Sequence, residues 1–116
     1  MKFELKMELD GQEKVFARER HLDLSDLENA LVLQLNQRKR AEKAEKGHES
    51  ANDIKQNLQD IGRFLVKFFD NQFTVDQAIS GLAPSQGLEI DTFVMAALGE
   101  NTETAEKADE EQEAKK

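Results

Sequence analysis

The sequence contains no cysteine, no tryptophan and no tyrosine, and its only proline is Pro84. Without cysteine the chain can form no disulfide bond, no thiolate nucleophile and no cysteine metal site. The first residues, MKFELKMELDG, interrupt every apolar pair with a charged residue. This stretch therefore predicts neither a secretory signal nor a membrane span.

Groups suited to catalysis are also scarce. His21 and His48 are the only side chains that titrate near neutral pH, and no acidic residue or second histidine stands at a ligand spacing such as i, i+4 that would make either a convincing metal site. No serine lies in a nucleophile elbow, and no glycine-rich phosphate-binding loop is present. We therefore expect no catalytic residue, no metal site, no cofactor and no small-molecule substrate, and we expect that the protein is not an enzyme.

The charge balance is acidic, with a formal net charge of -8. Such a field disfavours binding to nucleic acid. The exception is a basic run with two interspersed glutamates, which consists of Arg38, Lys39, Arg40, Lys43 and Lys46. We interpret this run as the solvated end of a helix. The alternatives are contact with nucleic acid, with an acidic partner, or with the acidic tail of a second copy.

The length of 116 residues predicts one domain, which we place at residues 1–99 and follow with a flexible acidic tail at 100–116. The domain begins with a strand pattern, because Phe3, Leu5, Met7 and Leu9 alternate with charged residues. An Asp-Gly pair follows and suits the positive φ angles of a type I′ turn. Residues 2–18 therefore predict a β-hairpin.

A helix is predicted at about residues 26–46, with Ser25 as its N-cap and Glu28 completing a capping box. One apolar face of this helix consists of Leu27, Ala30, Leu31 and Leu35. Val32 and Leu33 lie off that face, so the stretch is apolar nearly all round. We expect it to be deeply buried or shared with a partner, which makes self-association an option.

Three further helices are predicted, at about residues 52–69, 75–80 and 89–98. The first has the strongest periodicity in the chain, a seam of Ile54, Leu58, Ile61, Leu65 and Phe68. The second begins with the capping box Thr74-Val75-Asp76-Gln77, and we expect Gly81 to close it in a left-handed conformation. Together these segments predict an α+β fold, mostly helical, in which an N-terminal hairpin is followed by about four helices and a disordered acidic tail.

Four of the seven phenylalanines, Phe64, Phe68, Phe69 and Phe73, fall within ten residues. Aromatic residues at helical spacing usually belong to the core. The alternative is that one or two of them form an exposed binding patch.

The segment FLVKFFDNQFTVDQAISGL, residues 64–82, resembles the tail assembly chaperones of long-tailed bacteriophages. The shared elements are an aromatic pair, a short polar break, a Gln-Phe-Thr motif and a turn that ends in Gly-Leu. Asp70 stands where relatives more often have glycine, and Ser80 where they more often have an acidic residue. The layout of hairpin, leucine-rich helix, this block and acidic tail is also similar.

The resemblance implies a non-enzymatic chaperone of siphophage and myophage tail assembly. Such a protein binds the tape measure protein in the host cytoplasm, keeps it soluble, promotes assembly of the tail tube around it and is absent from the mature virion. The tail tube protein is a further implied partner. We expect no nucleic acid and no membrane among the partners.

The helices at residues 26–46 and 52–69 carry more apolar surface than one packing face needs, and this excess suggests where a partner binds. Our hypothesis places partner contacts at Val32, Leu33, Phe64, Phe69 and Phe73. Two other functions stay open at this point. One is a small regulatory or DNA-associated phage protein that uses the basic run, and the other is a structural tail or head-completion component.

Overall fold

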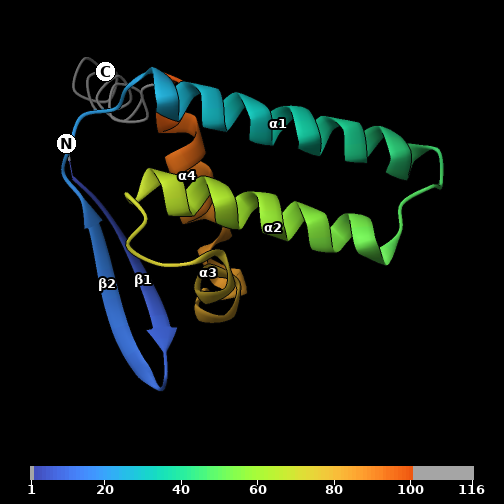
Figure 1. The fold of residues 1–116 in the computed structure, drawn as a ribbon. Helices are drawn as coiled ribbons and strands as arrows, with labels where there is room; N and C mark the ends of the chain where they lie inside the picture. Colours follow the sequence, from blue (N-terminus) through green and yellow to red (C-terminus); the bar gives the residue numbers. More distant parts are fainter. Residues whose placement is uncertain (1, 101–116) are drawn as a thin grey trace, which may run out of the picture.

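A computed structural model of the chain describes residues 2–100. A two-stranded antiparallel sheet, β1 (Phe3–Leu9) and β2 (Gln12–Arg18), is followed by the helices (Figure 1). These are α1 (Leu24–Glu45), α2 (Ala51–Phe68), α3 (Val75–Gly81), a short 3-10 turn η1 (Pro84–Gln86) and α4 (Gly87–Ala97). The predicted α+β class, a hairpin followed by four helices, is confirmed. All but the first residue of the predicted acidic tail lies outside the described part of the chain.

The hairpin forms as the residue alternation predicts. The four apolar side chains of β1 are buried and its charged residues are exposed. Asp10 and Gly11 have φ angles of 54° and 76°, so both adopt the left-handed conformation that a type I′ turn requires. Phe3 pairs with Arg18 at the open end of the hairpin. The hairpin therefore presents one apolar face to the helices.

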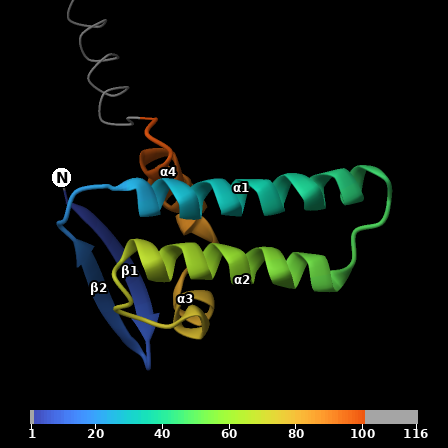
Figure 2. The same ribbon diagram turned by 45° about the horizontal axis from the view of Figure 1, so that its top comes forward.

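The helices α1 and α2 form a long antiparallel pair that extends well beyond the hairpin (Figures 1 and 2). Each begins with a capping box, in which the side chain of the N-cap and that of the third helical residue bond each other's backbone N–H. The boxes are Asp23 with Asp26 and Ser50 with Asp53. The predicted cap at Ser25 is therefore wrong by two residues.

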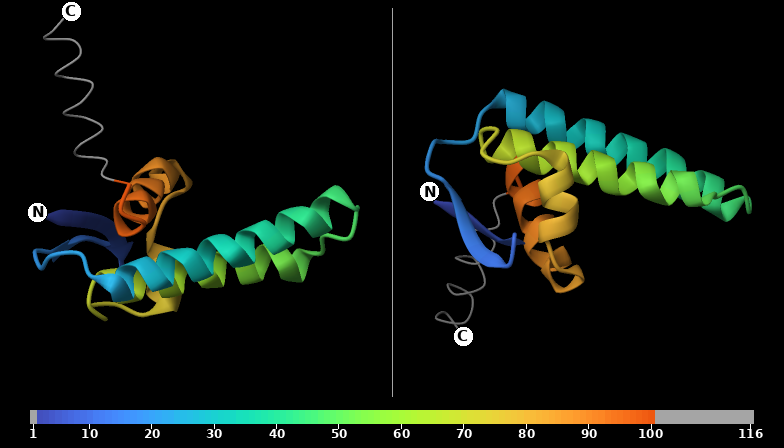
Figure 3. Two further views of the ribbon diagram at one scale, coloured as in Figure 1. Left: turned by 90° about the horizontal axis from the view of Figure 1, so that it is seen from above. Right: turned by 60° about the horizontal axis from the view of Figure 1, so that its bottom comes forward.

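Segments α3, η1 and α4 lie across α2 and beside the hairpin (Figure 3). The predicted capping box of Thr74 and Gln77 is confirmed. Gly81 is not left-handed, since the left-handed glycines among residues 2–100 are Gly11, Gly47 and Gly99. Instead, its missing side chain allows close approach to β1, because an added Cβ would lie 3.1 Å from Cβ of Met7.

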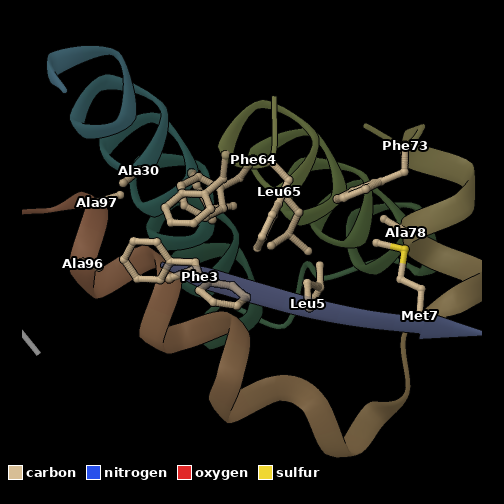
Figure 4. Close-up of a cluster of buried hydrophobic side chains, with 14 of the residues drawn as sticks. Phe3, Leu5, Met7, Ala30, Phe64, Leu65, Phe73, Ala78, Ala96 and Ala97 are labelled. Atoms are coloured by element: carbon tan, nitrogen blue, oxygen red, sulfur yellow. The ribbon is translucent and has the colours of Figure 1, made fainter. Parts of the chain in front are cut away.

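The core lies where β1, α2 and α4 meet (Figure 4). Phe68 is at its centre, with ring centroids 5.1 Å from Phe3, 5.2 Å from Phe69 and 5.3 Å from Phe93. Six of the seven phenylalanines are buried, and Phe16 is partly buried against this cluster. Such edge and offset contacts add to the free energy gained by burial of the rings.

The packing face of α1 differs from the predicted one. The buried residues are Asp26, Ala30 and Leu33, whereas Leu31 and Leu35 are exposed. Because this stretch is apolar nearly all round, its own periodicity could not select the side that faces α2 and α4. The rest of the fold makes that selection.

Candidate functional site

The structure separates the predicted partner-binding residues into two groups. Val32 is 52% exposed, so partner binding through it stays a prediction. The other four are buried with at most 4% exposure, and they are Leu33, Phe64, Phe69 and Phe73. The excess apolar surface assigned to these four side chains is therefore core. For the phenylalanines, the core alternative is the one that the structure favours.

Val32 itself has polar surroundings. It lines a depression between α1 and α2 together with Leu33, Phe64 and the charged residues Asp60, Arg63 and Lys67. Leu33 and Phe64 are buried, so Val32 is the one of these three apolar side chains that is exposed there. Charged residues around a single valine make a weak apolar contact surface. A larger apolar site has to be sought elsewhere in the described residues.

An apolar groove with a volume of about 390 Å³ lies between α2, α3 and α4. Leu58 and Ile61 line it on the α2 side, next to the fully buried Leu65, while Ile79 lies on the α3 side and Ile90 on the α4 side. Every residue that lines it is apolar or glycine. Ligand and peptide sites are commonly concave and apolar in this way.

The groove depends on a close approach of α3 to α2. A Cβ added at Gly62 would lie 2.8 Å from Cγ1 of Val75, so only glycine allows this distance. The approach holds α3 across the middle of α2. The first half of the α2 seam then extends past α3 without cover.

That uncovered half contains Ile54 and Leu58, which are 55% and 49% exposed. Together with the partly buried Ile61 they form a continuous apolar strip along α2. Its length is about 10 Å, since each helical residue adds about 1.5 Å. The groove and this strip form one surface, which we call the α2 groove.

Sequence reasoning found half of the α2 groove. The seam of Ile54, Leu58, Ile61 and Leu65 is visible in the sequence, but its periodicity predicts a packing face along its whole length. The contributions of Ile79 and Ile90 were missed, because isolated isoleucines in two short helices carry no sign that they converge. One available signal was that the helix at 75–81 is too short to cover an eighteen-residue helix.

The basic run is partly neutralised. Nη2 of Arg40 lies 2.7 Å from Oδ2 of Asp60, and Nζ of Lys43 lies 2.8 Å from Oδ2 of Asp53. The Lys43 bond and the capping bonds from Ser50 lower the pKa of Asp53 to about 2. These pairs join α1 to α2, which fits the interpretation of this run as a helix end.

A buried polar network holds the ends of β2, α1 and α2 together. The carboxylate of Asp26 accepts two hydrogen bonds from Arg18, at 2.7 Å and 2.5 Å. Burial raises the pKa of the Asp26 carboxyl, but the bonds from Arg18 and from the backbone of Asp23 bring it below its ordinary value. This network is structural, because the side chains of Arg18 and Asp26 are both buried in the interior.

Neither histidine contributes to a recognisable site. His21 is exposed and offers its carbonyl oxygen to Arg18 at 2.9 Å, and His48 lies in the turn after α1. Within residues 2–100 no group of three or more His, Asp or Glu residues is placed to hold a metal ion. None of the helices in this part of the chain is long and apolar enough to cross a membrane.

The segment of residues 64–82 has a distinct structural role at each shared element. Phe68 and Phe69 lie in the core, and Asp70 and Asn71 form a left-handed turn with φ angles of 60° and 59°. Thr74 caps α3, and Gly81 approaches β1. The residues that carry the resemblance therefore shape the turn and helix that border the α2 groove.

Comparison with known proteins gives one result. No curated protein and no solved structure matches the chain. A family model described as "phage tail chaperone protein" matches residues 1–116, the whole sequence. The chain therefore belongs to the phage tail chaperone family.

Proposed function

We propose that this tail assembly chaperone binds the tape measure protein through the α2 groove, keeps it soluble and promotes assembly of the tail tube around it. Membership of the family supports the chaperone role. The resemblance implies that the partner is the tape measure protein. It also implies that the chaperone acts in the host cytoplasm and is absent from the virion. The observation that carries the proposal is the apolar α2 groove, which continues onto exposed residues of α2.

The shape of the α2 groove suits an amphipathic helix. Such a helix presents apolar side chains at i, i+3 or i+4, and i+7, which span about 10 Å along its axis. The strip from Ile54 to Ile61 has about this length, which is two turns of a helix. A tape measure protein is long and largely helical, and it exposes stripes of this kind until the tube surrounds it.

The affinity of the α2 groove for the tape measure protein has to be low enough for the chaperone to be released when the tube forms. The α2 groove is open and offers several modest apolar contacts instead of one deep pocket. Affinity depends on the quality of a few contacts and on the cost of ordering them, so a surface of this type binds reversibly.

The charges on α3 and α4, the two helices beside α2, favour a partner helix with basic flanks. After Lys67 the next basic residue in the sequence is Lys107, and Asp76 and Asp91 lie on the two helices that border the groove. Both side chains are exposed. The net charge of -8 also keeps a complex with an apolar partner soluble.

Co-expression with the tape measure protein from the same tail gene cluster tests the proposal. Leu58→Asp and Ile79→Asp place a charge in the α2 groove, and we expect each to reduce the co-purified soluble tape measure protein at least tenfold. Leu88→Asp is the matched control, because Leu88 is 82% exposed and does not line the groove. Circular dichroism verifies that all three variants are folded.

Normal recovery of the tape measure protein with both groove variants would refute the groove as its binding site. Val32→Asp belongs in the same series, because Val32 is the one exposed residue of the set inferred from sequence.

Mass spectrometry of purified phage particles tests whether the chaperone is absent from the mature virion. We expect the tail tube and tape measure proteins in those particles and no peptide of this chain.

A further inference from the structure

A second apolar surface lies on the outer side of α1. Leu24, Leu31 and Leu35 are 79%, 51% and 45% exposed. They are separated by seven and four residues, so they lie within about 40° of one another around the helix. The buried residues Ala30 and Leu33 are on other sides of α1. Figures 1 and 3 show α1 along one edge of the molecule, beside α2 and α4.

Charged residues complete this stripe. Glu28 lies between Leu24 and Leu31, and Arg38 follows Leu35 by three residues. The order along the stripe is therefore Leu, Glu, Leu, Leu, Arg at spacings of four, three, four and three, which is the spacing of a coiled-coil seam. Glu28 and Arg38 are exposed, and neither belongs to an ion pair within residues 2–100.

We propose that this stripe pairs antiparallel with the same stripe of a second copy of the chain. When Leu31 faces Leu35 of the second copy, Glu28 faces Arg38 of the second copy, because both pairs have the same midpoint in the sequence. Two-fold symmetry produces each of these contacts twice. The stripe is thus complementary to itself in both apolar character and charge.

The charges select both the orientation and the occupant. In a parallel pair, Glu28 would face Glu28 of the second copy, and Arg38 would face Arg38 of the second copy. Both contacts would be repulsive. Only the antiparallel arrangement pairs opposite charges. A helix of an unrelated partner would have no reason to carry the inverse order of charges, so a second copy is the occupant.

The interface is small. One pair of helices of 22 residues places two leucines from each copy, Leu31 and Leu35, in contact. Standard stable interfaces bury about 800 Å² per partner, and weaker assemblies bury less. We therefore expect a dimer that dissociates on dilution. The stripe is on α1 and the α2 groove is on α2, α3 and α4, so dimerisation does not depend on the tape measure proposal.

Analytical ultracentrifugation of the full chain over a range of concentrations tests the dimer. The unaltered protein is expected to show a reversible monomer–dimer equilibrium. Glu28→Arg and Arg38→Glu should each weaken dimerisation at least tenfold, because each creates two repulsive contacts. The double variant Glu28→Arg/Arg38→Glu exchanges the charges and should restore the dissociation constant of the unaltered protein.

Val15→Arg is the control, since Val15 is 51% exposed on β2, away from α1. It should leave the dissociation constant unchanged. A monomer at every concentration would overturn the proposal. So would a dimer that Glu28→Arg does not weaken, or a double variant that dimerises no better than the single variants.

The absence of cysteine allows a second test of the orientation. Glu28→Cys and Arg38→Cys are prepared separately and treated with a short thiol-specific cross-linker. The antiparallel arrangement predicts efficient cross-linking only in a mixture of the two variants. Efficient cross-linking of Glu28→Cys alone would indicate parallel pairing and would overturn the proposal.

Discussion

The guanidinium of Arg18 at the end of β2 donates two hydrogen bonds to the carboxylate of Asp26 in the first turn of α1. Nη1 lies 2.7 Å from Oδ1, and Nη2 lies 2.5 Å from Oδ2. Both side chains are buried. The same guanidinium donates to the carbonyl oxygen of Phe68 at 3.1 Å and lies 4.4 Å from the centre of its ring. One arginine thereby joins the hairpin, the start of α1 and the end of α2.

Removing either member of this pair should destabilise the protein strongly. Arg18→Met leaves the buried carboxylate of Asp26 without its partner, and Asp26→Leu leaves the guanidinium uncompensated. Each should lower the free energy of unfolding by about 3–5 kcal/mol, as for other buried pairs that lose one charge. The double variant should recover part of that loss, because no unpaired charge remains. Urea denaturation followed by circular dichroism measures all three.

An exposed pair gives the comparison for this prediction. Nζ of Lys6 lies 3.9 Å from Oε1 of Glu13, and both side chains are more than 60% exposed. Lys6→Met should change the free energy of unfolding by less than about 1 kcal/mol, since solvent screens such pairs. Equal effects of Lys6→Met and Arg18→Met would contradict the role assigned to the buried pair.

The same carboxylate makes stability depend on pH in the acid range. Burial raises the pKa of Asp26, but the bonds from Arg18 and Asp23 outweigh it and lower the pKa below its ordinary value of 3.8. The resulting stabilisation is complete above the ordinary value and is lost as pH falls through the lower pKa of the folded state. Asp26→Asn should therefore be less stable at pH 7, and the difference from the unaltered protein should shrink below about pH 4. A difference that is constant from pH 7 to pH 2 would contradict this prediction.

Phe64 and Val32 test how the predicted contact residues divide between core and surface. Phe64 is 3% exposed and Val32 is 52% exposed. Phe64→Asp buries an unpaired charge, so it should abolish the cooperative thermal transition and much of the helical circular dichroism. Val32→Asp should preserve both. A folded Phe64→Asp variant would show that this side chain is not needed in the core.

The local parts of this fold could be predicted from sequence. The β1 alternation, the Asp10-Gly11 turn and the Thr74 cap each depend on a few neighbouring residues. The cap of α1 could not be predicted, because Ser25 with Glu28 and Asp23 with Asp26 offer the same spacing. The choice between them depends on Arg18, which binds Asp26 from another element.

The candidate site needed the tertiary structure for the same reason. Ile79 and Ile90 reach the α2 groove only because α3 crosses α2 at Gly62. The outer stripe of α1 could not be recognised either, since periodicity places Leu31 on the face that is predicted to be buried. Periodicity shows that a helix has apolar faces, but the packing of other elements decides which of them remains exposed.

Gly81 and Gly87 provide a matched test of close packing between α3 and β1. A Cβ at Gly81 would lie 2.9 Å from Cδ2 of Leu9 and 3.2 Å from the backbone oxygen of Glu8. Gly81→Ala should therefore cost about 1–3 kcal/mol, as other overpacked sites do. Gly87 begins α4 with open space around it and a φ of -56°. Gly87→Ala should be neutral or stabilising by up to about 1 kcal/mol, and denaturation of both variants measures the contrast.

Asp70 occupies a position where two effects of glycine oppose each other. Its φ of 60° lies in the left-handed region, where glycine relieves strain, yet its carboxylate accepts a hydrogen bond of 2.5 Å from Nε of Arg20. At low salt the two effects of Asp70→Gly should nearly cancel, because an exposed ion pair contributes up to about 1 kcal/mol. Added salt screens the pair but leaves the backbone strain unchanged. The free energy of unfolding of Asp70→Gly should therefore rise relative to the unaltered protein as salt increases. Asp70→Asn separates the effect of the ion pair from that of the backbone strain, since it removes the charge and keeps the strain.

A salt-independent difference between Asp70→Gly and the unaltered protein would show that the bond to Arg20 does not stabilise the fold.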